Sequence, residues 1–215
     1  MNRRSVLTLT AAGASAALAG CAALFDASLP DALADVDPDP DQLPTPTIGS
    51  GGVSIDVYED FACPHCRDFE ADVVPELEER VLDPGTASYR HRDFVLPADE
   101  NRSVPMANAA RAVQAATGTD DEPTGQFFSY KRAVMEAGTP DDEELAAIAE
   151  ETIGIDPSVV ADALEENTYY PTLAAEWEAA NGEGIDRTPT VVVDGESVED
   201  PLDADGIVAA VEDAR

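Results

Sequence analysis

The chain has 215 residues, and its 45 aspartates and glutamates outnumber 12 lysines and arginines, which gives a formal net charge of -33. Nucleic acids and anionic lipid surfaces are bound largely through cationic side chains, so this charge argues against both as partners. Hydrophobic residues make up 44% of the chain, enough for a packed core. The length fits one or two domains.

The acidic residues are spread along the chain after residue 25, and Lys131 is the only lysine. Like charges at this density loosen a compact state in dilute buffer, whereas molar salt shortens the Debye length to about 3 Å and screens the repulsion. An ordinary domain with an acidic tail does not fit, because the charge is not confined to one end. The composition therefore predicts a protein of a halophilic, archaeon-like organism that folds in high salt.

Residues 1–21 have the features of an export signal. Arg3 and Arg4 precede the uncharged, mostly apolar residues 6–19, and residues 18–21 are Leu-Ala-Gly-Cys. The arginine pair resembles a twin-arginine signal, and the last four residues resemble a lipobox, in which the cysteine carries the lipid. The alternative is a short buried helix with a core cysteine. The segment predicts an exported protein that a lipid on Cys21 anchors to the outer face of the cell membrane.

Residues 22–52 are rich in Asp, Pro, Ser, Thr and Gly, as in the Asp-Pro-Asp-Pro-Asp run at 37–41. Prolines and repeated like charges favour an extended, solvated chain. This acidic segment is therefore predicted to be a linker, and residues 53–215 are predicted to form a single domain.

The two remaining cysteines, Cys63 and Cys66, lie between two different patterns. Residues 53–58 alternate as a strand does, and residues 69–81 have an apolar side chain at every fourth position, as a helix does. Pro64 then falls in the first helical turn, where its missing N–H is not needed. Free N–H groups and the helix dipole at this end stabilise a thiolate. The spacing predicts a redox-active pair, with Cys63 as nucleophile, Cys66 as resolving cysteine and His65 placed to donate to the Cys63 sulfur.

Two alternatives use the same cysteines. A purely structural disulfide would close too small a loop to add much stability. A metal site could combine both cysteines with His65 and His91, but zinc usually takes four ligands, and the sequence has no second cysteine pair or nearby histidine pair. We therefore expect no metal, and no cofactor besides the redox-active disulfide Cys63–Cys66 itself.

Cys-Pro-His-Cys at residues 63–66 resembles the DsbA-like branch of the thioredoxin superfamily. Residues 184–195, in which Thr188 and Pro189 precede a run of valines, are similar to the segment of that family that carries a cis-proline. The resemblance covers about residues 53–213. It implies an α/β, thioredoxin-like fold with a helical insertion at about residues 100–182. It also implies that Pro189 is cis and faces the cysteines, and that Thr188 influences redox behaviour and substrate binding.

The residues alone leave a trans proline opening an edge strand as the alternative for Thr188 and Pro189. The rest of the pattern agrees with the resemblance. A second strand is predicted at 86–96, a third at 191–193, a short one at 196–198 and a closing helix at 203–213. Glycines and prolines separate five predicted helices, near 104–117, 124–137, 141–152, 157–166 and 171–181.

The sequence departs from the family at one position. Members often carry a buried acid six residues before the first cysteine, which is thought to assist proton transfer, but Val57 stands there. Asp60 is the candidate to replace it, the alternative being that Asp60 only supplies negative charge to the helix N-terminus. Phe61, beside the cysteines, is predicted to line a peptide-binding face, with core packing as the alternative.

These features together predict an exported, membrane-anchored thiol-disulfide oxidoreductase that forms disulfides in secreted proteins. Its partners would be thiol-containing exported proteins and a redox partner that reoxidises the cysteines. A disulfide reductase of the same fold and a non-catalytic binding lipoprotein on a thioredoxin scaffold are the alternatives. The direction of exchange depends on the reduction potential and the electron partner.

We expect the melting temperature of this protein to rise when KCl is increased from about 0.1 M to about 3 M, because screening removes repulsion among its acidic side chains. Thermal unfolding followed by circular dichroism measures the change. A melting temperature that does not respond to salt would contradict the prediction.

Overall fold

The computed structural model describes residues 28–96 and 99–215. The predicted export signal at residues 1–21, including Cys21, lies outside this part of the chain. Within it, no helix has both the length and the apolar character needed to cross a membrane.

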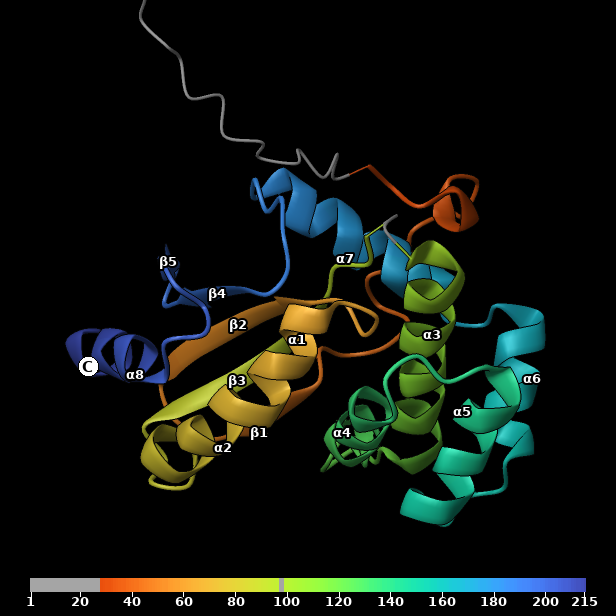
Figure 1. Cartoon of the computed structure of the whole chain (residues 1–215), viewed down its shortest axis with the longest axis horizontal. Coiled ribbons are helices and arrows are strands. Elements are labelled where there is room, and N and C mark those ends of the chain that lie inside the picture. Colours follow the sequence, from red (N-terminus) through yellow and green to blue (C-terminus); the bar gives the residue numbers. More distant parts are fainter. Residues whose placement is uncertain (1–27, 97–98) are drawn as a thin grey trace, which may run out of the picture.

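In the described residues, the fold consists of five strands and eight α-helices, whose arrangement is drawn in Figure 1. The strands are β1 (Thr47–Gly49), β2 (Val53–Glu59), β3 (Ala87–Asp93), β4 (Thr190–Val193) and β5 (Glu196–Ser197). The α-helices are α1 (Pro64–Asp68), α2 (Val74–Leu77), α3 (Glu100–Thr117), α4 (Phe127–Ala137), α5 (Asp142–Ile148), α6 (Ser158–Glu166), α7 (Tyr170–Gly182) and α8 (Ala204–Asp213). Shorter helical turns are η1 (Asp31–Leu33), which is 3-10, and η2 (Phe69–Val73), η3 (Glu78–Leu82) and η5 (Ala149–Ile153), which are π-helical.

The strands form one mixed sheet in the order β1-β3-β2-β4-β5. The central strand β2 runs parallel to β3 and antiparallel to β4, so that Val57 lies between His91 and Val191. A parallel neighbour requires a crossover connection. Here the helical rod formed by α1, η2, α2 and η3 makes that crossover and begins directly after the end of β2.

The rod confirms the helical pattern predicted for residues 69–81. Its fourfold apolar positions, from Phe69 to Val81, are buried against one face of the sheet, where α8 packs as well. Pro75 cannot donate a backbone hydrogen bond and its ring crowds the preceding turn. The rod stays helical because the turn before Pro75 is π-helical, which relaxes the bonding pattern locally.

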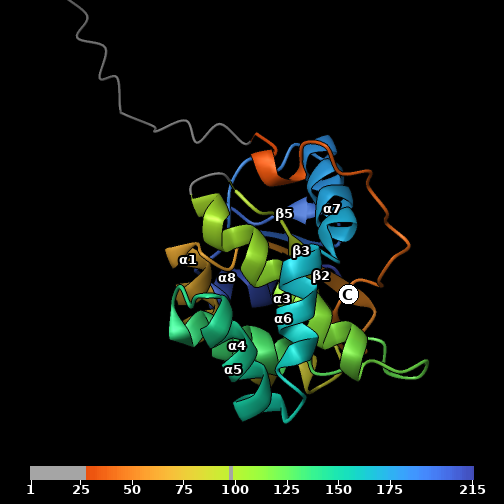
Figure 2. The same ribbon diagram turned by 90° about the vertical axis from the view of Figure 1, so that its right-hand side faces the viewer.

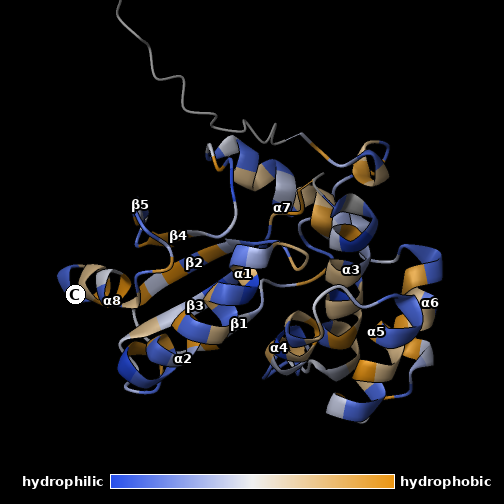
Figure 3. Ribbon diagram, viewed as in Figure 1, coloured by the Kyte–Doolittle hydropathy of each residue, from blue (hydrophilic) through white to orange (hydrophobic). Residues whose placement is uncertain are grey.

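Helices α3 to α7 lie between β3 and β4 in the chain and form a helical insertion beside the sheet (Figures 1 and 2). Small side chains on α3, among them Ala107 and Ala110, are fully buried in its core. Figure 3 shows hydrophobic residues concentrated on β2, on β4 and on the inner sides of the helices. The predicted α/β, thioredoxin-like fold with a helical insertion is confirmed.

The prediction of a solvated linker over residues 22–52 is wrong for its folded part, residues 30–49, here called the N-terminal strap. Leu33 has 0% exposure and packs in the core of the insertion. Further along the strap, β1 pairs antiparallel with β3, and Ile48 of β1 lies opposite Tyr89 of β3. The strap therefore belongs to the domain.

Hydrogen bonds explain why a segment so rich in Asp and Pro folds onto the domain. The Gln42 side chain donates to Thr168 O at 2.8 Å, and the Gln114 side chain donates to Pro44 O at 2.8 Å. The backbone N–H of His91 donates to Pro46 O at 2.9 Å. Prolines lack an N–H to satisfy, and their carbonyls accept bonds from distant residues. The composition of a segment does not reveal such distant partners.

We expect Leu33→Ala to lower the free energy of unfolding by roughly 2–5 kcal/mol, because it leaves a cavity in the core. Urea unfolding in high salt measures the change. Leu202→Ala is the matched control, since Leu202 is 41% exposed, and surface substitutions usually change stability by about 0.5 kcal/mol or less. A strap that hung free in solvent would make the two variants equally stable.

Candidate active site

The two cysteines lie at the junction between the end of β2 and the start of the helical rod, as the sequence predicts. Cys63 caps α1, and Pro64 is the first helical residue. The Cys63 N–H donates to Asp60 O at 3.0 Å, which closes the turn between strand and helix. Cys63 is half-buried, Cys66 is fully buried, and both are free thiols.

The Cys63 sulfur is placed to carry a negative charge. A hydrogen bond from the Cys66 thiol is the largest cause that lowers the pKa of Cys63, to about 5, against the opposing effect of burial. The backbone N–H groups of His65 and Cys66 act in the same direction, as does the Thr188 hydroxyl. The two N–H groups are free donors at the N-terminus of α1. Cys63 is therefore a thiolate at neutral pH.

Cys66 has the opposite character. Burial raises the pKa of its thiol well above the usual value, and its hydrogen bond to Cys63 and the charge of Glu59 add to the rise. One cysteine is thus ionised while the other keeps its proton. At neutral pH Cys63 is therefore the more nucleophilic of the two, and Cys66 can attack only after it loses its proton.

The His65 side chain does not donate to the Cys63 sulfur, so that part of the prediction is wrong. Its imidazole is 71% exposed, and Nδ1 lies 3.7 Å from Asp68 Oδ2. The cause is helical geometry, which turns position 65 outward toward the residue three positions on. His65 contributes through its backbone N–H instead.

Phe61 does not line a peptide-binding face, and that prediction is also wrong. Its side chain has 0% exposure. The ring makes edge contacts with His91 and Phe127, at centroid distances of 5.7 and 6.4 Å. The side chain of Phe61 fills the core between the sheet and the insertion, where burying an aromatic ring is most favourable.

The Thr188-Pro189 peptide bond is cis, as the family resemblance implies. The Cys63 thiol lies 3.6 Å from Thr188 O, so residues 125 positions apart meet at the site. Thr188 and Cys63 line a cavity of about 470 Å³, here called the redox cavity, together with Asp60, Leu96, Ser103 and Arg187. Pro189 is buried and lines a different cavity.

Asp60 lies directly beside Cys66. Its own N–H points at the Cys66 sulfur at 3.5 Å, and its carboxyl oxygens accept from the N–H groups of Ala62 at 2.8 Å and Leu96 at 2.7 Å. Burial raises the pKa of Asp60 to about 6 despite these hydrogen bonds. Asp60 can therefore gain or lose a proton near neutral pH, whereas Val57 is an apolar core residue.

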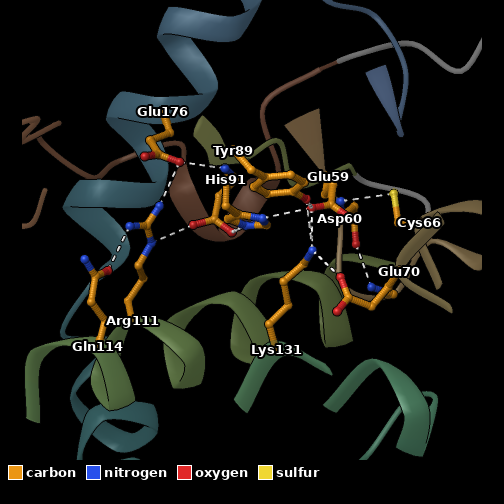
Figure 4. Close-up of polar contacts among 12 residues, drawn as sticks. Glu59, Asp60, Cys66, Glu70, Tyr89, His91, Arg111, Gln114, Lys131 and Glu176 are labelled. Carbon is orange, nitrogen blue, oxygen red and sulfur yellow. Dashed lines mark hydrogen bonds and ion pairs between the residues drawn. The ribbon is translucent and has the colours of Figure 1, made fainter. Parts of the chain in front are cut away.

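Glu59 is the second acid near Cys66 (Figure 4), and no motif of the sequence predicts a role for it. Its Oε2 atom lies 2.7 Å from Lys131 Nζ, 2.6 Å from the Tyr89 hydroxyl and 3.0 Å from His91 Nδ1. Burial alone would raise the pKa of Glu59, but Lys131 and His91 outweigh it and the pKa falls. Glu59 stays ionised. The strand alternation already pointed to it, since residues 53, 55, 57 and 59 share a buried face.

Glu59 is one member of a chain of buried charges that crosses from the rod through the sheet to the insertion (Figure 4). Neighbouring members lie within 3.0 Å of one another, in the order Glu70, Lys131, Glu59, His91, Asp93, Arg111, Glu176. Burial works against a charged imidazole, but Asp93 and Glu59 raise the pKa of His91 above its usual value. We call these seven residues the buried charge network.

The described residues contain no group of three or more His, Cys, Asp or Glu side chains that could hold a metal ion. Both ring nitrogens of His91 face carboxylates of the buried charge network. His65 and His91 therefore do not meet around the cysteines, as a metal site would require.

Comparison with known proteins agrees with this geometry. The sequence matches the thioredoxin family over residues 45–213. This chain belongs to the thioredoxin family. Disulfide bond formation protein D of Bacillus subtilis (strain 168) is 21% identical to it over 176 residues, which are 78% of this chain and 75% of that protein.

Two crystal structures share the fold of this thioredoxin-family chain. Oxidised BdbD from Bacillus subtilis has a TM-score of 0.69 at 21% identity, over 79% of this chain and 91% of that one. DsbA from Chlamydia trachomatis has a TM-score of 0.68 at 24% identity, also over 79% and 91%.

We expect iodoacetamide labelling of the reduced protein to follow ionisation of Cys63 at about pH 5 and to leave Cys66 unlabelled at neutral pH. Cys66→Ala removes the hydrogen bond that lowers the pKa of Cys63 most. The pH midpoint of labelling should then move upward, toward the ordinary cysteine pKa of 9.0. We expect a rise of at least about one pH unit, which corresponds to a tenfold higher affinity of the thiolate for a proton.

Cys66→Ser is the matched control, because a serine hydroxyl can donate from the same position. It should keep most of the lowering that Cys66→Ala removes. Identical labelling midpoints for these two variants would show that the Cys66 thiol does not stabilise the thiolate.

Proposed function

We propose that this protein is an exported thiol-disulfide oxidoreductase that forms disulfides in secreted proteins. The observation that carries the proposal is the pairing of an ionised Cys63, open to the redox cavity, with a protonated, buried Cys66. A protein named for disulfide bond formation, from Bacillus subtilis, is similar over most of the chain.

The oxidised enzyme starts the proposed reaction. A substrate thiolate attacks the Cys63 sulfur, the Cys63–Cys66 bond breaks, and Cys66 leaves as a thiolate that takes up a proton. A second substrate thiolate then attacks the substrate sulfur of the mixed disulfide and releases Cys63 as a thiolate. Two substrate thiols are oxidised to one disulfide, and the enzyme disulfide is reduced to two cysteines, which a redox partner must reoxidise.

The charge on Cys63 supports the proposed direction of exchange. Every interaction that stabilises its thiolate stabilises the reduced enzyme, so the enzyme disulfide becomes a stronger oxidant. The N–H groups and the Cys66 thiol around Cys63 therefore favour oxidation of substrates over their reduction.

Asp60 is the proposed proton donor and acceptor for Cys66. Its backbone N–H points at the Cys66 sulfur, which makes the two residues neighbours. The pKa of its carboxyl, about 6, lets both protonation states occur near neutral pH. Glu59 is a poor candidate because Lys131 holds it as a carboxylate. Glu59 instead supplies a fixed negative charge that keeps the proton on Cys66.

The proposed location is the outer face of the cell membrane, with a lipid on Cys21 as the anchor. The paired arginines and the Leu-Ala-Gly-Cys run support this part of the proposal. The N-terminal strap is folded onto the domain from residue 30 onward, so few residues of the sequence would separate the proposed anchor from the domain. Such a short tether would keep the enzyme close to the membrane surface and to substrates as they emerge.

The reduction potential of the Cys63–Cys66 pair tests the direction. Equilibration with glutathione in about 3 M KCl, read by quantifying thiols, should give a value closer to about -120 mV, typical of a strong oxidant, than to about -270 mV, typical of a reductant. A value near the second figure would make the protein a reductase. With a disulfide-bonded substrate, the reduced Cys66→Ser variant should accumulate mixed disulfides on Cys63, because no Cys66 thiol is left to displace the substrate, whereas Cys63→Ser should form none.

A further inference from the structure

The redox cavity contains a buried hydroxyl group without a hydrogen-bond partner. Ser103 lies in the first turn of α3 and is 1% exposed, and its Oγ atom bonds to no atom of the described residues. Ser103 nevertheless lines the cavity together with Asp60 and Cys63. Buried hydroxyl groups are almost always paired, so an unpaired one that faces a functional cavity requires an explanation.

The neighbouring Asp60, in contrast, is fully hydrogen-bonded but almost inaccessible to solvent. The carboxyl is 2% exposed, and each of its oxygens accepts one backbone N–H, from Ala62 and from Leu96. A carboxyl buried this deeply exchanges protons slowly with bulk water unless a second group passes protons between the carboxyl and the water. Burial raises the pKa of Asp60 to about 6, and the Ser103 hydroxyl is among the groups that oppose the rise. The hydroxyl therefore lies close to this carboxyl, although it makes no hydrogen bond of ordinary geometry to it.

We propose that Ser103 is a positioning residue that passes protons between the Asp60 carboxyl and water in the redox cavity. The proposal rests on the exchange function proposed above and adds a residue to it. Because the hydroxyl has no fixed partner, it can rotate between the carboxyl on one side and the cavity on the other.

The proposed proton transfer conserves atoms and charge in both directions of the exchange. When Cys66 resolves a mixed disulfide on Cys63, its thiol gives a proton to the Asp60 carboxylate, the Cys66 sulfur bonds to Cys63, and the other thiolate leaves. The Asp60 carboxylic acid then passes its proton to the Ser103 oxygen while the Ser103 hydroxyl proton goes to a cavity water. When a substrate opens the enzyme disulfide, the same proton transfers run in reverse.

Other charged groups also influence this carboxyl. His65 of α1, Asp99 ahead of α3 and Arg187 ahead of β4 line the same cavity. Glu59 precedes Asp60 in the chain, and the Cys63 charge raises the pKa of Asp60. None of these groups is altered by substituting Ser103, so a comparison of variants isolates the hydroxyl.

The test uses the reduced full-length protein and the aromatic disulfide DTNB in about 3 M KCl. Attack by Cys63 releases one thionitrobenzoate, and resolution by Cys66 releases a second, so the two phases report the two cysteines separately. In Ser103→Ala we expect the second phase to slow by roughly 3- to 30-fold near pH 6.5, a part of the 10²–10⁴ that acid-base catalysis typically contributes. Its pH midpoint should move upward, because the ionised carboxylate loses a stabilising neighbour. The first phase should be unchanged.

Two further variants separate a proton-transfer role from a structural one. Ser103→Thr keeps the hydroxyl and should restore the rate and midpoint of the second phase. Thr172→Val removes another buried hydroxyl, which bonds Gln42 far along the chain, and should leave both phases unchanged.

A second phase of wild-type rate and midpoint in Ser103→Ala would overturn the proposal. So would equal slowing in Ser103→Ala and Ser103→Thr. Failure of the proposed exchange function has a different signature, since the wild-type protein itself would then release no second thionitrobenzoate.

Discussion

The buried ion pair between Glu59 and Lys131 holds the molecule together where β2 ends and the active site begins. Placing a lone carboxylate in the core is strongly unfavourable, so Glu59 at this position requires a buried cation. Lys131 comes from α4 of the insertion, and it also binds Glu70 of the rod. Lys131 thus links the insertion, β2 and the rod. These contacts hold the end of β2 in place, and the active-site turn begins there.

The ionic interactions of this protein fall into two classes that respond differently to salt. Acidic side chains on the surface repel one another, and dissolved ions screen them. The buried charge network is shielded from solvent, so its attractions persist at any ionic strength. Its ends reach Glu70 in the rod and Glu176 in α7, and Arg111 also lies near the carbonyl of Pro44 in the strap. The internal ion pairs therefore join the layers of the fold at low and at high salt.

Two adjacent acidic residues at the end of β2 differ in their charge states at neutral pH. Glu59 faces the insertion and is held as an anion by Lys131, whereas Asp60 faces the redox cavity and titrates near neutral pH. This difference follows from their positions in the chain, because Glu59 is the last residue of β2 and Asp60 belongs to the turn that leads to Cys63. In the proposed exchange, the fixed charge of Glu59 keeps the proton on Cys66, and Asp60 takes that proton when resolution begins.

The sequence by itself determined the local features: the strand before Cys63, the helix after it, the pattern of helices in the insertion and the second motif around Pro189. These depend on periodicity and on spacing, which a linear sequence contains. The tertiary structure decided which side chains meet. It placed Phe61 in the core, turned the His65 ring toward Asp68, folded the strap onto the domain and paired Glu59 with the only lysine, 72 positions away. Contacts between distant residues depend on how the layers pack, and neither composition nor local pattern specifies them.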